Sequence, residues 1–230
     1  MMDFERIEPW ADDVIASSFE NWPKELRIHA LAEPLVEIPM SANDIRTVLS
    51  HNPQYRRFLN RTQPEPLFTK SLGKKIEGDA FPKIGPVSWK EISAFINVPL
   101  AAFDELLPMM LRSVTDRMAF VLHAFVVRQV PTNLHIFPFI DLGAAYEARF
   151  RIENGKPVHA KWINRDGRPG PPPGSGERLS LSAAEIASST GIHHGLLDLL
   201  LMQEDGHERI KVVEVNPILE IGASGRLFIT

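Results

Sequence analysis

The chain has 230 residues, of which 44% are apolar and 23% charged, close to the average of globular proteins. These proportions exclude a disordered tail, a coiled coil and a collagen-like chain. The 25 Lys and Arg residues against 29 Asp and Glu residues give a net charge of −4. The whole molecule therefore has no positive field, which does not favour nucleic acid as a partner. Cysteine is absent, which excludes thiolate metal sites, disulfides and Cys nucleophiles.

Residues 1–63 are expected to form a small helical or mixed cap. The first residues, MMDFERIEPWADD, are acidic and lack the apolar core of a signal peptide. No window reaches the roughly 18 apolar residues that a membrane span needs. Ser41 followed by Asp44 predicts a helix start, with an N-cap and an acidic residue in the first turn. Together with the lack of cysteine, these features predict a cytoplasmic protein without a membrane partner.

Two prolines, Pro64 and Pro66, mark the boundary of a second region, residues 64–130. This region opens with a short apolar segment, PLFTK, that ends in a base, Lys70. A Gly- and Lys-rich stretch, SLGKKIEGDAFPKIG, follows and contains Lys83 in a second aromatic context. Such a stretch predicts a loop.

The rest of the second region is expected to hold two helices and a strand. Ser88 and Glu91 have the spacing of a capping box, so a helix is predicted to start at Ser88. A helix is predicted over residues 104–111, although Pro108 disfavours it. Residues 118–130 end in AFVVRQVP, and the β-branched residues before Pro131 predict a strand.

Residues 131–230 are expected to be rich in strands. Two strands in AYEARFRIENGKPVHAKWIN meet at Asn154-Gly155, the strongest short signal for a hairpin turn. The first of them alternates apolar and charged residues, so one face is apolar and the other charged. Two more strands, GLLDLLLMQ and IKVVEVNPI, are predicted to meet at Asp205-Gly206.

A Pro- and Gly-rich segment and a helix are expected between these hairpins. Residues 165–178 contain four Pro and four Gly residues, which predicts a surface loop without regular structure. Ser182 and Glu185 have the spacing of a capping box, so a helix is predicted to start at Ser182. Gly191 suits the position just after its C-terminus.

Three polar residues interrupt the apolar C-terminal strands: Asp198, Glu214 and Asn216. Glu214 and Asn216 are two residues apart on one strand and so share a face, which Asp198 joins if the register allows. Two carboxylates and an amide oxygen form the hard-oxygen set that Mg²⁺ takes with nucleotide phosphates. Taken alone, the same pattern is also typical of the solvent face of an ordinary hairpin.

The segment GLLDLLLMQEDGHERIKVVEVNP resembles the C-terminal sequence of the ATP-grasp nucleotide-binding fold. In that family an Asp-bearing strand precedes a strand ending in Glu-x-Asn-Pro, whose Glu and Asn bind Mg²⁺ and phosphates. The resemblance implies this role for Glu214 and Asn216, with Asp198 as a third residue on the metal or phosphate side.

The resemblance extends upstream of the C-terminal hairpin. Glu147 and Arg149 match an E-x-R strand of the family, found also in the branch that contains a cell-division-cycle chaperone for translation-factor assembly. This implies that Arg149 faces phosphate or substrate, as the catalytic residue, and that Glu147 belongs to the nucleotide site.

The family's adenine hinge would correspond to FVVRQVP, with Arg128 and Gln129 beside the nucleotide. Lys70 would be the first phosphate lysine, and Lys83 competes for that role.

The resemblance implies an α+β fold in which two subdomains with antiparallel sheets, residues 64–130 and 131–230, clasp a nucleotide and follow the cap. It implies ATP and Mg²⁺ as cofactors and an unknown small-molecule or protein substrate. The expected function is a carboxylate–amine ligase that works through an acyl phosphate. The alternative is a nucleotide-binding assembly or regulatory module without ligase activity.

Overall fold

The computed structural model describes residues 2–64, 80–89, 103–140, 142, 145–163, 171–204 and 207–219. The chain divides into two compact units, each described here by itself. Unit 1 contains Met1–Glu20 and Glu33–Phe139, and unit 2 contains Asn21–Ala32 and Ile140–Thr230. The bounds of these units differ from those predicted for the cap and the two subdomains. The predicted division into a cap and two subdomains stays a prediction.

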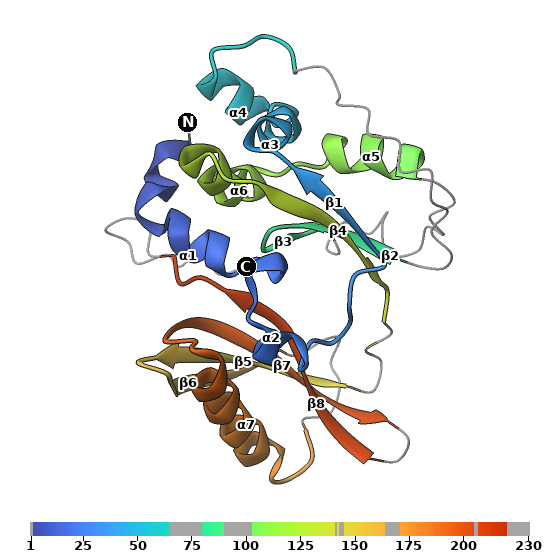
Figure 1. Cartoon of the computed structure of the whole chain (residues 1–230), viewed down its shortest axis with the longest axis vertical. Helices are drawn as coiled ribbons and strands as arrows, with labels where there is room; N and C mark the ends of the chain where they lie inside the picture. Colours follow the sequence, from blue (N-terminus) through green and yellow to red (C-terminus); the bar gives the residue numbers. More distant parts are fainter. Residues whose placement is uncertain are drawn as a thin grey trace. The chain divides into compact units, whose positions relative to one another are not determined.

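Unit 1 combines helices with a four-stranded antiparallel sheet of order β1-β4-β2-β3 (Figure 1). Its strands are β1 (Val36–Met40), β2 (Ala80–Ile84), β3 (Val87–Ser88) and β4 (Thr132–Pro138). Its helices are η1 (Phe4–Trp10), α1 (Ala11–Ala16), α3 (Ala42–Leu49), α4 (Pro53–Phe58), α5 (Phe103–Arg112) and α6 (Asp116–Arg128), and η2 (Phe19–Asn21) lies at the junction with unit 2.

The register of the unit 1 sheet separates an apolar row from a polar row. Ile38, Leu134, Ile84 and Val87 are successive partners across the four strands. One residue along, the partners are Glu37, His135, Lys83 and Ser88. Because neighbouring residues of a strand point to opposite faces, the two rows lie on opposite faces of the sheet.

Two helices predicted in unit 1 are confirmed. A third was predicted to start at Ser88, but Ser88 belongs to β3, and residues 90–102 lie outside the described residues. At the start of α3, the Ser41 hydroxyl accepts from the Asp44 backbone N–H, and the Asp44 carboxylate accepts from the Ser41 backbone N–H. This is the reciprocal arrangement of a capping box. The helix predicted over residues 104–111 is α5, with Pro108 inside it.

The strand predicted over residues 118–130 is wrong, because this segment is the helix α6. Thr115 caps its N-terminus by accepting from the backbone N–H of Met118. Every residue from Met118 to Val126 is buried, so the sequence lacks the one-sided apolar stripe that marks a surface helix. Gln129 ends the helix with a φ of 54°, so no hinge strand exists at Arg128 and Gln129.

Unit 2 contains a second antiparallel sheet, of order β6-β5-β7-β8. Its strands are β5 (Tyr146–Glu153), β6 (Lys156–Ile163), β7 (His194–Glu204) and β8 (His207–Asn216), and its helices are α2 (Lys24–Arg27) and α7 (Ser175–Thr190). Both predicted hairpins are confirmed. Asn154 and Gly155 have φ values of 51° and 73°, as the predicted turn requires. Residues 205 and 206 lie outside the described residues.

An N-terminal segment extends the unit 2 sheet beyond β8. Ala30 forms a parallel bridge with Val212. The Leu31 backbone N–H donates to the Val212 carbonyl at 2.8 Å, and the Val212 N–H donates to the His29 carbonyl at 2.7 Å. Residues 29–31 therefore pair along β8.

The helix α7 covers the apolar face of the unit 2 sheet. It contacts β5, β6 and β7, and a Cβ at Gly176 would lie 3.7 Å from the Trp162 ring. Trp162 is the register partner of Ala148, so α7 lies on the face of Ala148 and Phe150. The opposite face carries Glu147 and Arg149.

The predicted start of α7 at Ser182 is wrong. The helix begins at Ser175, after Gly174 with a φ of 81°, and ends at Gly191 as expected. The predicted loop is therefore shorter at its C-terminal end, and residues 164–170 lie outside the described residues.

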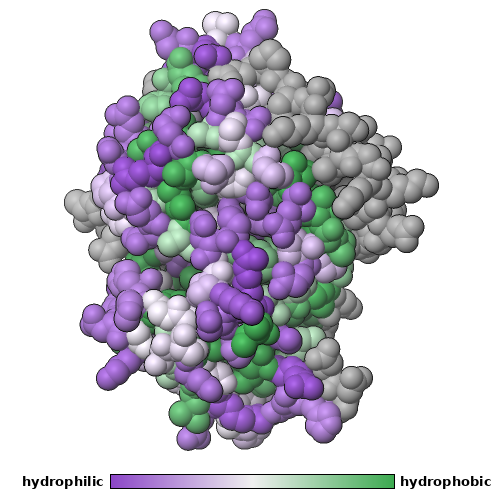
Figure 2. Space-filling view, in the orientation of Figure 1, coloured by the Kyte–Doolittle hydropathy of each residue, from purple (hydrophilic) through white to green (hydrophobic). Residues whose placement is uncertain are grey.

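The surface in view mixes hydrophilic and hydrophobic residues, and Figure 2 shows the hydrophobic ones in several separate patches. In the part of the chain that the structure describes, no helix is long and apolar enough to cross a membrane.

Candidate functional site

A row of four charged residues crosses the whole unit 2 sheet. Lys161 on β6 is the register partner of Arg149 on β5, Arg149 is the partner of Asp198 on β7, and Asp198 is the partner of Glu214 on β8. Direct partners in an antiparallel sheet point to the same face. The row therefore places two bases beside two acids on the face opposite α7.

The central pair of the row is a bidentate ion pair. Arg149 Nε donates to Asp198 Oδ1 at 2.7 Å, and Arg149 Nη2 donates to Asp198 Oδ2 at 2.6 Å. The same Nη2 lies 3.8 Å from Glu214 Oε1. This fork geometry fixes the orientation of the guanidinium as well as its charge. Arg149 and Glu214 thus share one side of the sheet.

Burial governs the electrostatics of this pair. Asp198 is 0% exposed, and burial raises the pKa of its carboxyl to about 7, against the Arg149 hydrogen bonds and together with the Glu214 charge. Burial lowers the pKa of Arg149, but the hydrogen bonds and charge of Asp198 outweigh it, so the net pKa is raised. Glu214 and Glu147 add to that rise.

Acidic groups outnumber the guanidinium at this position. Glu147 lies two residues before Arg149 on β5 and so on the same face. The exposed fractions of Glu147, Asp198 and Glu214 are 4%, 0% and 7%. Three nearly buried carboxylates therefore lie near Arg149 on this face of the sheet.

Asn216 is a buried polar side chain on the same face. It is 1% exposed, and neither Nδ2 nor Oδ1 of its amide has a hydrogen-bond partner among the described residues. Buried amides are almost always hydrogen-bonded, since an unmet one costs about 1–3 kcal/mol. A ligand that reached this amide would remove that cost.

The oxygen set of this face fits a magnesium ion in its chemistry. Glu214 and Asn216 would offer a carboxylate and an amide oxygen, both hard ligands. Both Asp198 oxygens already accept hydrogen bonds from Arg149. Across the described ranges, no group of three or more His, Asp or Glu side chains is arranged to hold a metal by itself.

The other predicted site residues belong to unit 1 or lie outside the described residues. Lys83 is nearly buried on β2, between Ser88 and His135 in the register. Arg128 ends α6 and donates through Nε to Asp12 Oδ1 at 2.9 Å. Gln129 donates from its side-chain amide to the Val126 carbonyl. Lys70 lies outside the described residues.

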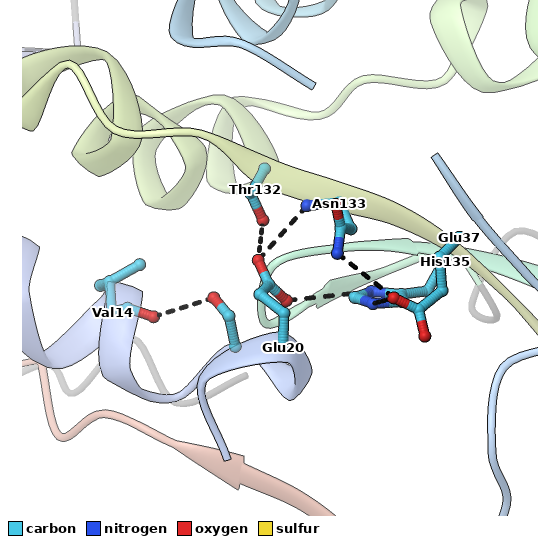
Figure 3. A network of polar contacts seen from close by, with 7 residues as sticks. Val14, Glu20, Glu37, Thr132, Asn133 and His135 are labelled. Carbon is cyan, nitrogen blue, oxygen red and sulfur yellow. Dashed lines mark hydrogen bonds and ion pairs between the residues drawn. The ribbon is translucent and has the colours of Figure 1, made fainter. Parts of the chain in front are cut away.

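A polar network around His135 in unit 1 was not predicted. His135 lies between two acids, with Nδ1 3.9 Å from Glu20 Oε2 and Nε2 3.6 Å from Glu37 Oε2 (Figure 3). Glu20 also accepts from the Thr132 hydroxyl and from the Asn133 backbone N–H. Because its members lie far apart in the sequence, no local motif could indicate this network.

Two β-bulges set the charged row and explain why the sequence did not indicate Lys161. A two-residue turn at Asn154-Gly155 alone would pair Arg149 with Ala160, but a shift between Arg151 and Ile152 pairs it with Lys161. In the terminal hairpin, a shift between Asp198 and Leu199 pairs Asp198 with Glu214. Bulges of this kind re-aim side chains and are hard to read from sequence.

The fold is similar to that of Cdc123 from Schizosaccharomyces pombe. The TM-score is 0.54 at 16% identity, over 90% of this chain and 85% of that chain. A C-terminally truncated form of the same protein gives a TM-score of 0.54 at 17% identity, with the same coverage. D-alanine–D-alanine ligase from Bacillus anthracis complexed with ATP gives 0.35 at 17% identity, over 88% and 55% of the two chains, too low to support an argument.

No protein-family model matches the sequence, and no curated protein matches it. The structural likeness therefore establishes the fold. The chain has the expected α+β, ATP-grasp-like fold, which is similar to that of Cdc123 at 16% identity.

Proposed function

We propose that the chain binds Mg-ATP on the polar face of the unit 2 sheet and uses it to activate a carboxylate. The observation that carries the proposal is the row of Arg149, Asp198 and Glu214 with the unsatisfied amide of Asn216 beside it. A fixed guanidinium next to a hard-oxygen set is suited to a metal–polyphosphate ligand.

Each residue of the row would have a distinct role. Arg149 would contact the phosphates, because a guanidinium stabilises the charge of a transferring phosphoryl group. Asp198 is a positioning residue in this proposal, since both its oxygens hold Arg149 in place. Glu214 and Asn216 would hold the magnesium ion, which supplies charge neutralisation on the phosphates.

The proposed reaction follows the ATP-grasp ligases that the sequence resembles. An oxygen of the substrate carboxylate attacks the γ-phosphorus, the bond to the bridging oxygen breaks, and ADP leaves with that electron pair. An amine then attacks the acyl carbon, loses its proton and displaces inorganic phosphate. The chain's own contribution is positioning and charge stabilisation.

A second candidate function is a nucleotide-binding assembly or regulatory module. The sequence supports it through its resemblance to the ATP-grasp branch that contains a chaperone for translation-factor assembly, and the chain spans 85% of the Cdc123 structure that it resembles in fold. In this case the same row would bind Mg-ATP without ligation.

Calorimetric titration of the full chain with ATP, with and without Mg²⁺, tests the shared part of both proposals. We expect Mg²⁺-dependent binding that Glu214→Gln weakens at least tenfold. Glu185→Gln, an exposed acid on α7, is the matched control and should bind as the wild type does. An affinity for ATP that changes neither on removal of Mg²⁺ nor in Glu214→Gln would rule out the site.

Turnover separates the two functions. ADP release that rises with a carboxylate and an amine indicates a ligase, and hydroxylamine in place of the amine should trap the acyl phosphate as a hydroxamate. Tight Mg-ATP binding without ADP release across pools of amino and carboxylic acids indicates the module.

A further inference from the structure

A pocket of about 310 Å³ opens within unit 1. None of its lining residues belongs to the charged row of unit 2. Its lining residues belong to η1, α3, α4 and α6 or directly follow α4. Its volume is at the lower end of the roughly 300–1,000 Å³ of small-molecule sites. The lining residues are Glu5, Glu8, Arg46, Tyr55, Phe58, Leu59, His123, Val126 and Val127.

One wall of the pocket is aromatic. The rings of Tyr55 and Phe58 lie 5.6 Å apart, and those of Phe58 and His123 lie 5.3 Å apart at 82°. Leu59, Val126 and Val127 complete the apolar surface. Such a wall accepts a flat apolar group through stacked and edge-to-face contacts.

Arg46 supplies a positive charge whose Nε–H has no hydrogen-bond acceptor among the described residues. This Nε is buried. A buried donor without an acceptor costs about as much as a lost hydrogen bond. Because Arg46 lines the pocket, an anionic group of a ligand placed there would provide the missing acceptor.

His123 keeps the interior of the pocket neutral. Its Nδ1 lies 2.8 Å from the Tyr55 hydroxyl oxygen, which leaves Nε2 as the ring nitrogen not bound by Tyr55. Burial, followed by the charge of Arg46, lowers the pKa of His123 to about 4. The imidazole is therefore uncharged near pH 7 and does not compete with Arg46 for an anion.

The rim of the pocket is acidic but partly balanced. Glu5 and Glu8 are exposed, and Glu8 Oε1 lies 3.7 Å from Arg128 Nη1. These carboxylates are in solvent, where their field on a buried ligand is weak. Among its lining residues the pocket thus has one cationic side chain, the half-buried Arg46, beside an apolar wall.

We propose that this pocket binds a small free carboxylate with an apolar or aromatic body. The carboxylate would accept hydrogen bonds from Arg46, and the apolar body would pack against Phe58 and Tyr55. The site uses none of the residues of the charged row and stands whether or not the chain binds ATP.

Protein-observed NMR of the full chain tests the proposal with two probes of equal shape. 3-Phenylpropionate should cause saturable shifts in α3, α4 and α6, whereas its neutral amide, 3-phenylpropionamide, should bind at least tenfold more weakly. Arg46→Gln should weaken 3-phenylpropionate binding by about tenfold or more. Arg57→Gln, an exposed arginine on α4 outside the pocket, should leave it unchanged.

A second variant guards against a folding defect in Arg46→Gln. Val127→Phe adds bulk at the half-buried pocket wall and should abolish binding while Arg46 remains. Equal binding of the carboxylate and the amide would overturn the proposal, as would no binding of either, or wild-type affinity in Arg46→Gln or Val127→Phe.

Discussion

Arg149 and Asp198 face each other in register across β5 and β7, and hydrogen bonds of 2.7 and 2.6 Å join the guanidinium to both carboxylate oxygens. The pair holds a cation at a fixed angle on the polar face of the sheet. Asp198 is fully buried, so neither group can be removed without leaving the other in a low dielectric.

The first prediction compares two arginines of one strand. Arg149→Ala should lower the free energy of unfolding by about 3 kcal/mol or more, because it leaves a buried carboxylate unpaired. Arg151 instead donates to Glu153 on its own strand, and both side chains are partly exposed. Arg151→Ala should therefore cost less than about 1 kcal/mol.

Urea titration of both variants measures these costs. At a temperature where both are folded, Arg149→Ala should also weaken ATP binding far more than Arg151→Ala. If Arg149→Ala and Arg151→Ala lost stability and ATP affinity equally, the ion pair between Arg149 and Asp198 would have no special role in either property.

The second prediction is that a substitution at Asn216 raises the stability of the protein and impairs its ligand binding. Asn216→Leu keeps the approximate volume and removes an amide without a described partner, so the free energy of unfolding should rise by about 1 kcal/mol. The same change should abolish the Mg²⁺ dependence of ATP binding. Thermal unfolding and calorimetry of one preparation measure both effects, and a less stable variant would mean that the amide is satisfied in solution.

The third prediction concerns the pH dependence that Asp198 causes. Burial raises its pKa from 3.8 to about 7, so between these values the folded chain holds a proton that the unfolded chain has lost. The free energy of unfolding should therefore fall as pH rises from about 4 to 7. Asp198→Asn should remove this part of the slope in urea titrations, and an unchanged slope would contradict the assignment.

The fourth prediction has the opposite sign and comes from His123 in unit 1. Burial lowers its pKa from 6.5 to about 4, so the unfolded chain binds the proton more tightly. Stability should decrease by up to about 3 kcal/mol as pH falls from 6.5 to 4. His123→Gln should flatten this slope, whereas His159→Gln, an exposed histidine of β6, should keep it.

Local patterns predicted the hairpins and failed for α6. The turn at Asn154-Gly155 needs two residues with positive φ, and few sequences supply them, so the signal is specific. The α6 segment is buried on all sides, and a run of apolar residues has no period that distinguishes helix from strand. Its length of 13 residues was the better guide, because strands rarely extend so far.

The candidate site was predictable in part. Glu214 and Asn216 share a face because they are two residues apart on one strand, and this follows from the sequence. The placement of Glu214 opposite Asp198 depends on a bulge, since the turn alone would pair Asp198 with Val213. The pairing of Lys83 with His135 joins distant segments and has no local signal.

The bridge between Ala30 and Val212 has a consequence for how the chain is made. Residues 29–31 are synthesised long before β8. Their pairing partner, Val212, follows about 180 residues later in the chain. Contacts of such long sequence separation slow folding, so we expect unit 2 to complete its sheet only after β8 has been synthesised. A fragment that begins at Ile140 would lack this edge segment and expose the backbone of β8 to association with other chains.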